Sequence, residues 1–427
     1  ERGEFFSCGC VLQDRTLFKN IYLLPGGSRW TFNKDFEVKK DFYFRPSDWE
    51  DQELLTKEVF YQRLNDTFRK ILPRYFQSKS QIAMSLTGGL DSRMVMAGLG
   101  ELDIKLPCYT FGSMYHDSYD VRISRKIAQA CHQGHQVLRL NEEFLKNFQL
   151  YAEKTVFVTD GCFDVAGAYE IYLNKLARNI APIRMTGDYG SEVLRSVSTF
   201  KAVHPRERFL SQDFSQYAQD AIRTYLEIRK GNSLTFSVFK DAPWHMYGFL
   251  SSAQSQLILR TPFMDNDLVK LVYQAPEEFR RTNELSMRLI SDYNKNLIMI
   301  ETDRGFGGDA NNIISKWKQL FYWTILKAEW YVNEGMPQWI HLFRLLYQPL
   351  RLEKIFLGRH KFYHYRIWYR RELSDYIQSV LLDNGVEKRM YFNPDFVKKM
   401  VTDHIRGHRN YTNEITQMMT VELINRR

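Results

Sequence analysis

Apolar and polar residues alternate along this chain with two different periods, and these periods predict its elements. Residues 1–48 alternate over short stretches around the sequence Leu24-Pro-Gly-Gly, which indicates short strands and a turn. Over residues 51–76 apolar side chains recur at helical spacing, so we expect an amphipathic helix there. The apolar face expected to be buried carries Leu54, Val59, Leu64, Phe68 and Ile71.

Strands and helices are predicted to alternate from residue 82 to about residue 194. The expected strands cover residues 82–86, 108–111, 137–140 and 182–185. The expected helices cover residues 120–130 and 168–179, and another begins near Asp91. This alternation is typical of an α/β fold with a doubly wound parallel sheet, which binds ligands at the carboxyl ends of its strands. Beyond about residue 205 the pattern becomes mostly helical and rich in aromatic residues and arginine.

The loop after the first of these strands carries the most specific chemistry in the chain. Two adjacent glycines permit a sharp turn and a close approach to a ligand. Amides at the start of the next helix, together with three nearby hydroxyls, form a site for an anion. An aspartate beside phosphate implies a cation between them, which predicts Mg²⁺. The expected nucleotide-binding residues are Ser85, Leu86, Thr87, Gly88, Gly89, Asp91 and Ser92.

The glycine pair alone is equally compatible with a purely structural turn. The complete Ser/Thr-Gly-Gly-x-Asp-Ser string is more specific, because it is the pyrophosphate loop of ATP-pyrophosphatases. The sequence contains no Gly-Lys-Ser/Thr triplet, which a Walker loop would need. We therefore expect an ATP site of the pyrophosphatase type.

Two later strand ends add candidate residues. Phe111 and Gly112 end the second expected strand, where a glycine lets adenine approach the backbone, although it also serves simply to end a strand. The sequence Thr186-Gly187-Asp-Tyr-Gly-Ser-Glu192 ends a later strand, and Glu192 is a candidate second Mg²⁺ ligand. A solvated acidic turn is the simpler interpretation of that segment, but its place at a strand end favours a site.

Five segments, in order, resemble the synthetase domain of asparagine synthetase and its relatives, which include β-lactam synthetases and lasso-peptide cyclases. Residues 86–92 are similar to the family's LSGGxDS, and residues 186–192 to its SGEGSDE loop. The next strand and helix of the family resemble Phe111-Gly112 and the helix after Asp120. The family's RxPFLD motif is similar to Arg260-Thr-Pro-Phe-Met-Asp265, and its KxGFG turn is similar to residues 303–307. The match covers roughly residues 50–310.

The resemblance implies activation of a carboxylate by ATP and Mg²⁺ as an acyl-adenylate, with release of pyrophosphate, followed by attack of ammonia or an amine. It also implies that the backbone at Leu86 and Phe111 holds adenine and that Thr186 and Gly187 flank the nucleotide. The activated acid is expected to belong to a small molecule, a peptide or a glycan.

Two departures from the family pattern concern the amide-forming step. Without a gap, Ser191 falls where the family has its second metal-binding aspartate; one inserted residue places Glu192 there instead and Tyr189 at the position of the β-lactam synthetase base. We prefer the gapped register because it keeps a carboxylate for Mg²⁺. The family's catalytic lysine corresponds to Asp303, beside Arg304, which is a candidate to stabilise the adenylate transition state or a surface arginine. Tyr189 and Arg304 are therefore the expected catalytic residues, and free asparagine is a doubtful product.

Residues 11–27 resemble the last strands of the family's N-terminal glutaminase domain, whose nucleophile is an N-terminal cysteine. Glu1 stands first here, so we expect truncation or processing, with most of that domain absent and no hydrolysis of glutamine. The expected domains are a glutaminase-like β remnant at residues 1–48, an ATP-binding synthetase domain at 49–310 and a basic, aromatic helical extension at 311–427.

Composition narrows the setting. The net charge of +9 suits an anionic partner such as ATP, nucleic acid or an acidic substrate. Five cysteines without paired CxxC spacing favour a reducing, cytoplasmic compartment, and no apolar stretch is long enough to suggest a membrane partner.

Residues 351–371 interleave seven Lys or Arg with aromatic side chains. Such a segment binds single-stranded nucleic acid in some proteins, which raises a tRNA-modifying ATP-pyrophosphatase as an alternative. An amphipathic helix that packs its aromatics inward is the preferred interpretation, so nucleic acid is a disfavoured partner. Docking of an acidic peptide or glycan is a third use. Ser191 and Asp303 raise a second alternative function, a degenerate nucleotide-binding protein without catalysis.

Overall fold

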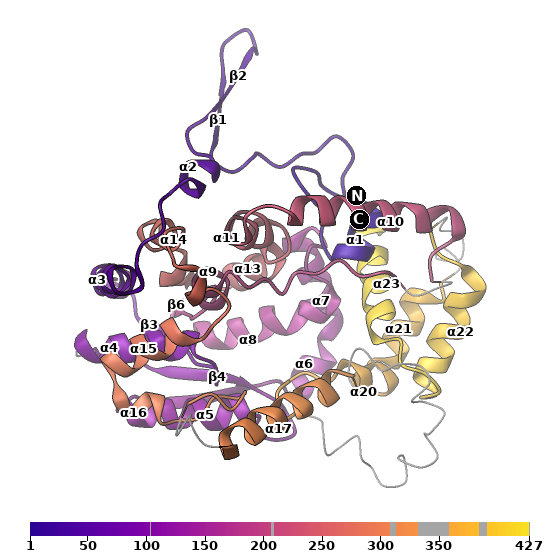
Figure 1. Cartoon of the computed structure of the whole chain (residues 1–427). Coiled ribbons are helices and arrows are strands. Elements are labelled where there is room, and N and C mark those ends of the chain that lie inside the picture. Colours follow the sequence, from indigo (N-terminus) through magenta and orange to yellow (C-terminus); the bar gives the residue numbers. More distant parts are fainter. Residues whose placement is uncertain (103, 206–208, 308–312, 332–357, 384–390, 427) are drawn as a thin grey trace.

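The computed structural model describes residues 1–102, 104–205, 209–307, 313–331, 358–383 and 391–426 (Figure 1). At its centre is a five-stranded sheet in the order β5-β4-β3-β6-β7, and every neighbouring pair is parallel. Its strands are β3 (Ile82–Ser85), β4 (Cys108–Gly112), β5 (His135–Arg139), β6 (Ile183–Met185) and β7 (Ile258–Arg260). Four of them confirm the sequence prediction to within two residues at both ends, whereas β7 was not expected.

Successive side chains of the strands enter two different cores. Ala83 and Tyr109 belong to one core, whereas Met84 and Cys108 belong to the other. Side chains of a strand point alternately to opposite faces, so both faces of this sheet are covered. The structure thus confirms the expected α/β fold with a doubly wound parallel sheet.

Helices from different parts of the chain cover the two faces. The core with Met84 contains side chains from α3 (Lys57–Phe76), α4 (Asp91–Leu99), α5 (Tyr119–Ala130), α9 (Gly190–Arg195), α14 (Asn266–Val272), α15 (Glu284–Tyr293) and α16 (Lys295–Ile298). The core with Ala83 contains side chains from α6 (Glu142–Lys146), α7 (Phe148–Thr159), α8 (Ala168–Arg178), α20 (Tyr365–Arg370), α21 (Ser374–Leu381), α22 (Pro394–Ile405) and α23 (Thr412–Asn425). The C-terminal helices therefore share a core with the sheet.

Further helices lie around this body. They are α2 (Ser47–Glu50), α10 (Gln212–Arg229), α11 (Ser233–Phe236), α12 (Ala242–Trp244), α13 (Tyr247–Gln254) and α17 (Ile313–Trp330). In the part of the chain that the structure describes, no helix has the length and apolar character needed to cross a membrane.

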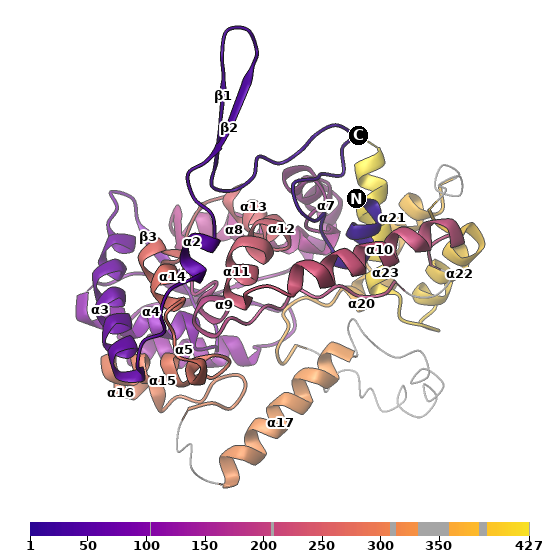
Figure 2. The same ribbon diagram turned by 45° about the horizontal axis from the view of Figure 1, so that its top comes forward.

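The N-terminal segment differs in part from the prediction. Its first element is a helix, α1 (Arg2–Cys8), where short strands were expected. Phe5 and Phe6 of α1 are buried in the core shared with the C-terminal helices, and this burial outweighs the local strand-like alternation. Short strands occur later, as the hairpin of β1 (Ser28–Phe32) and β2 (Val38–Phe42), which projects from the body (Figures 1 and 2). The hairpin turns at residues 33–37, whereas the predicted turn at Leu24-Pro-Gly-Gly comes just before β1. The division into three domains stays a prediction.

The helix expected over residues 51–76 is shorter than predicted. It begins at Lys57, after the Thr56 side chain accepts a hydrogen bond from the Val59 amide. Leu64, Phe68 and Ile71 are buried as expected, but Leu54 and Val59 are 52% and 42% exposed. The error lies at the N-terminal end, where capping rather than apolar spacing sets the start of the helix.

Candidate active site

Two glycine-containing loops meet at the centre of the sheet. Residues 85–92 follow β3, and residues 186–192 follow β6. The strand order makes β3 and β6 neighbours, yet the chain leaves β3 toward β4 and leaves β6 toward β7, on opposite sides. The carboxyl ends of strands at such a switch form the ligand crevice of open parallel sheets. The fold thus brings together the two loops that the sequence indicated.

Glycines allow direct contact between these loops. A Cβ on Gly187 would lie 2.2 Å from the Ser92 backbone nitrogen, and a Cβ on Gly190 would lie 2.6 Å from the Asp91 carboxyl carbon. No side chain tolerates such distances, so both positions require glycine while the loops keep this arrangement. Asp91 consequently lies at the junction of the two loops.

Asp91 is held by the second loop. Its Oδ2 accepts hydrogen bonds from the Ser191 amide at 3.1 Å and from the Ser191 hydroxyl at 2.7 Å. Arg195 donates to the same hydroxyl. Burial raises the pKa of Asp91, and the hydrogen bonds from Ser191 and the charge of Arg195 oppose that rise. Ser191 therefore orients Asp91.

The residues present fit a magnesium ion bound together with ATP. A Cβ at position 190 would lie 2.8 Å from Asp91 Oδ1, so glycine leaves this oxygen room for a ligand. Within the described ranges, no group of three or more His, Cys, Asp or Glu side chains is arranged to hold a metal. Mg²⁺ needs only one or two carboxylates when phosphates and water supply its other ligands. Asp91 meets that requirement together with Glu192, which is close enough for the charge of Asp91 to act on it.

Glu192 and Tyr189 are both perturbed by burial. Burial raises the pKa of Glu192 to about 7, and the charge of Asp91 contributes to the rise. The Tyr189 side chain is only 5% exposed, and its hydroxyl has no hydrogen-bond partner among the described residues. Burial, followed by the charge of Asp188, raises the pKa of Tyr189. Tyr189 is thus a neutral phenol in this state, able to donate a hydrogen bond but poor as a base.

A second carboxylate pair lies beside the first glycine loop. The Gly88 amide donates to Asp120 Oδ1 at 2.6 Å, and the Asp303 amide donates to the Gly88 carbonyl at 3.4 Å. Burial raises the pKa of Asp120 to about 7, and repulsion from Asp303 adds to the rise. Asp120 thus occupies one backbone donor of the pyrophosphate loop. Sequence analysis assigned Asp120 no role at the site, although it marks the expected helix after Gly112.

Of two arginines near this pair, Arg93 is buried and Arg304 is exposed. Arg93 is fully buried, and its guanidinium donates to the carbonyls of Gly88 at 3.3 Å and Leu297 at 3.1 Å. It ties the first loop to the segment before Asp303. The Arg304 side chain is 63% exposed, with its Nε 4.0 Å from Asp303 Oδ2. Arg304 therefore lies at the rim, where the resemblance placed a catalytic cation, and its proposed role remains a prediction.

Comparison with known proteins gives the family. Residues 63–295, more than half of the chain, match the family described as asparagine synthase. The chain belongs to the asparagine synthase family. Membership places it among ATP-using enzymes of the ligase type.

Other comparisons add little. No curated protein matches the chain. Among solved structures, a U34-tRNA thiolase, NcsA, from Methanococcus maripaludis is 15% identical with a TM-score of 0.27, covering 64% of this chain and 81% of its own. An NMN synthetase from Francisella tularensis is 12% identical with a TM-score of 0.24, covering 57% of this chain and 94% of its own. Such low scores carry no argument, so the fold assignment rests on the sheet itself.

The RxPFLD-like motif at residues 260–265 is hydrogen-bonded to the second loop. The Thr186 amide donates to the Arg260 carbonyl at 2.9 Å, and the Thr261 hydroxyl donates to the Asp188 carbonyl at 2.6 Å. Arg260 itself donates to the Tyr75 carbonyl at the end of α3, 2.7 Å away. The motif therefore holds the second loop in place.

The expected adenine side is tightly packed. The Leu86 carbonyl accepts a hydrogen bond from the Thr110 hydroxyl at 3.0 Å. A Cβ on Gly112 would lie 2.6 Å from Val137, so this glycine is required for packing between β4 and β5. The Arg184 guanidinium lies 4.8 Å from the centre of the Phe111 ring. These contacts leave the adenine assignment of Leu86, Phe111 and Gly112 a prediction.

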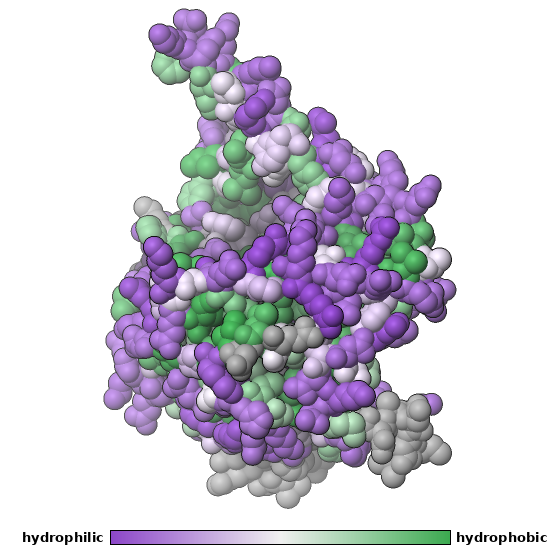
Figure 3. Space-filling model, turned by 90° about the vertical axis from the view of Figure 1, so that its left-hand side faces the viewer, coloured by the Kyte–Doolittle hydropathy of each residue, from purple (hydrophilic) through white to green (hydrophobic). Residues whose placement is uncertain are grey.

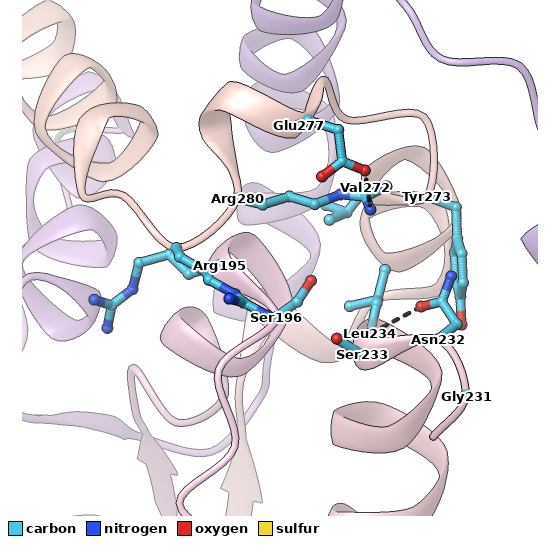
Figure 4. Close-up of a pocket in the computed structure, with 11 residues that line it drawn as sticks. Arg195, Ser196, Gly231, Asn232, Ser233, Leu234, Val272, Tyr273, Glu277 and Arg280 are labelled. Carbon is cyan, nitrogen blue, oxygen red and sulfur yellow. Dashed lines mark hydrogen bonds and ion pairs between the residues drawn. The ribbon is translucent and has the colours of Figure 1, made fainter. Parts of the chain in front are cut away.

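A separate hollow of about 420 Å³ lies behind the second loop (Figure 4). Arg195 and Ser196 line it, with Arg280 paired to Glu277 at 2.7 Å on its far side. Arg195 also contacts Ser191, so this hollow borders the support of Asp91. The hollow is therefore next to the residues that orient Asp91.

In the described part of the basic, aromatic segment, the rings of α20 are buried. Residues 351–357 lie outside the described residues, but Trp368 and Tyr369 of α20 are fully buried and Arg366 is 5% exposed. Rings in a core cannot stack on bases. This packing agrees with the preferred interpretation of an amphipathic helix.

Proposed function

We propose that this chain is an ATP-dependent, amide-forming ligase that activates a carboxylic acid as its acyl-adenylate. The observation that carries the proposal is the junction at Asp91, where the pyrophosphate-type loop after β3 contacts the glycine loop after β6 in a member of the asparagine synthase family. Both loops lie at the switch in strand order where such folds bind nucleotides.

The proposed reaction has two steps. A carboxylate oxygen of the acid attacks the α-phosphorus of ATP, and the bond between the α-phosphorus and the bridging oxygen breaks, so that pyrophosphate leaves. The nitrogen of ammonia or an amine then attacks the acyl carbon. The bond from that carbon to the AMP oxygen breaks, the nitrogen loses a proton, and AMP leaves.

The first loop suits the leaving pyrophosphate. Amides at Gly88 and Gly89, with the hydroxyls of Ser85, Thr87 and Ser92, place donors where negative charge develops. Asp91 and Glu192 would hold Mg²⁺, which neutralises phosphate charge when bound. The Gly88 amide becomes available to phosphate once its hydrogen bond to Asp120 breaks. The raised pKa of Asp120 favours the protonated carboxyl, which accepts a weaker hydrogen bond than a carboxylate does.

The amide-forming half depends on different groups. Tyr189 lies in the second loop with its hydroxyl unpartnered among the described residues, which supports a role for it in donating to the reacting acyl group or contacting the nucleophile. Arg304 at the rim supplies the permanent cation nearest Asp303. Five free cysteines agree with the proposed reducing, cytoplasmic setting.

Pyrophosphate–ATP exchange tests the activation half. The intact chain, Mg²⁺, ATP, labelled pyrophosphate and a panel of small-molecule, peptide and glycan acids are incubated together. We expect acid-dependent exchange that Asp91→Ala abolishes, whereas Asp66→Ala, which removes an exposed carboxylate on α3, leaves it unchanged. Equal exchange by the two variants would contradict the role of Asp91.

One observation favours a second function. Asp303 stands where the family has its lysine, and its carboxylate lies near Asp120 instead of supplying a cation to the phosphates. If the chain binds Mg-ATP but no acid of the panel supports exchange, a nucleotide-binding protein without catalysis accounts for the site better. A tRNA-modifying enzyme has weaker support, since the rings at α20 are buried.

A further inference from the structure

Large apolar side chains are exposed along helix α17. Both ribbon views show this helix at the lower edge of the molecule (Figures 1 and 2). It lies beyond residues 63–295, which match the family. Exposed apolar groups gathered on one element mark a contact with a partner. Six such side chains at residues 317–331 are between 41% and 67% exposed, namely Trp317, Leu320, Phe321, Trp323, Trp330 and Tyr331.

One side of α17 is fixed to the body of the protein. Tyr322, Ile325 and Glu329 recur at intervals of three and four residues, so they share one side of the helix. Ile325 and Glu329 are buried. The Glu329 carboxylate accepts hydrogen bonds from three backbone amides of the segment before α20, those of Gly358, His360 and Lys361.

The opposite side of α17 combines aromatic rings with lysine. Lys316, Leu320, Trp323, Lys327 and Trp330 recur there at intervals of four and three residues, and all five are exposed. Lys327 Nζ lies 5.8 Å from the ring centres of both Trp323 and Trp330. The acid of residues 316–331 is Glu329, which is buried on the other side. The outward side is therefore both apolar and positively charged.

This composition favours a lipid surface over a protein partner. Trp and Tyr concentrate at the level of lipid head groups. Lysine is depleted in the cores of protein interfaces, whereas beside a bilayer its ammonium group reaches the phosphates of anionic lipids. The surface is the side of one helix, unlike the apolar recess beneath the hairpin in Figure 3, which encloses a hollow of about 980 Å³. A flat, fluid partner needs no hollow to receive it.

We propose that the outward side of α17 docks this chain on the surface of an anionic lipid bilayer. The helix lies along the surface, with its rings among the head groups and its lysines beside the lipid phosphates. The sequence argued against a membrane partner because it lacks a stretch long enough to span one, and docking of this kind needs no such stretch.

Docking through α17 brings the rim of the candidate site to the lipid surface. The Tyr322 ring packs edge-on against the ring of Tyr119, which precedes Asp120, with 5.2 Å between their centres. A Cβ on Gly305, the residue after Arg304, would lie 3.2 Å from the Gln319 Cα. The helix therefore contacts the two segments that carry Asp120 and Arg304.

Sedimentation of the full chain with lipid vesicles tests the proposal. One set of vesicles is phosphatidylcholine, and the other is an equimolar mixture of phosphatidylcholine and phosphatidylserine. We expect the mixed vesicles to bind at least tenfold more tightly, because each lysine near an anionic surface contributes about fivefold. This preference should disappear at high salt, which screens the charges.

Matched variants locate the contact. Trp323→Ala should weaken binding to the mixed vesicles about tenfold, and Lys327→Gln about fivefold. Both positions are exposed, so the fold does not depend on them. The controls are Phe157→Ala and Lys154→Gln, which alter an exposed ring and an exposed lysine on α7 and should leave binding unchanged.

Three results would overturn the inference. The chain binds neither kind of vesicle, it binds both kinds equally, or the α7 variants weaken binding as much as the α17 variants do. A dimer that forms without lipid and that Trp323→Ala dissociates would also overturn it, because a second copy of the chain would then cover this surface. Vesicle binding requires neither ATP nor an acid, so its outcome is independent of the ligase proposal.

Discussion

Substitution of Gly187 by alanine tests whether the two glycine loops truly abut. In the structure a Cβ at this position would lie 2.2 Å from the Ser92 nitrogen, 2.6 Å from the Asp91 carbonyl carbon and 2.7 Å from the Ser92 Cα. All three are backbone atoms, so no side-chain rotation relieves the clash. Gly187→Ala therefore has to push the second loop away from the first.

The size of that displacement follows from the same distances. Moving from 2.2 Å to the 3.4 Å of an ordinary contact requires about 1.2 Å of separation. Overpacking of this kind typically costs about 1–3 kcal/mol of stability. A misplacement of roughly 1 Å in a catalytic site costs on the order of a hundredfold in rate. We expect a modest loss of stability and a much larger loss of pyrophosphate exchange.

Two assays on one preparation provide the comparison. The denaturation midpoint reports stability, and pyrophosphate exchange at saturating ATP reports the site. Gly134→Ala is the matched control, because a Cβ there meets no atom within 4 Å; it should change neither quantity. If Gly187→Ala keeps the stability and exchange of the unsubstituted chain, the two loops do not touch as described.

Two further predictions concern the carboxylate pair beside Gly88. Because the pKa of Asp120 is raised to about 7 in the folded chain, its contribution to stability is present at acid pH and is lost as the pH rises from about 4 through 7. Asp120→Asn keeps an acceptor for the Gly88 amide and should flatten this decline in stability, measured by denaturant unfolding across that pH range. The same pH dependence in both chains would contradict the raised pKa. Asp303→Lys places an ammonium beside Asp120 and the phosphate loop, so Mg-ATP should bind at least tenfold more tightly in a titration at pH 7, whereas weaker binding would show that the carboxylate itself is needed.

The sequence predicted the sheet well because its strands carry their own signals. Largely apolar runs at β3 and β4, bounded by turn residues, indicate buried strands whatever surrounds them. The Ser/Thr-Gly-Gly-x-Asp-Ser string likewise predicted the loop after β3, since the complete motif is specific. Three-residue β7 carried too little pattern to be recognised.

Features that depend on distant contacts were not predictable from sequence. Helix α1 is stabilised by Phe6, whose ring packs against Phe209, Phe214 and Phe392, and no local pattern reveals these distant partners. The pairing of Asp120 with the Gly88 amide joins residues 32 positions apart. Ser191, which falls at the family's second metal-binding aspartate only in the ungapped register, orients Asp91 through two hydrogen bonds. Such roles follow from the folded arrangement of the loops.

The central claim is that the site at Asp91 cleaves ATP between its α- and β-phosphates. The most direct measurement incubates the chain with ATP labelled at the α-phosphate, Mg²⁺, the acid panel and ammonia, and identifies the labelled product. We predict acid-dependent formation of AMP, with pyrophosphate in equal amount, and its loss in Asp91→Ala. Labelled ADP, or AMP formation that persists in Asp91→Ala, would contradict the account.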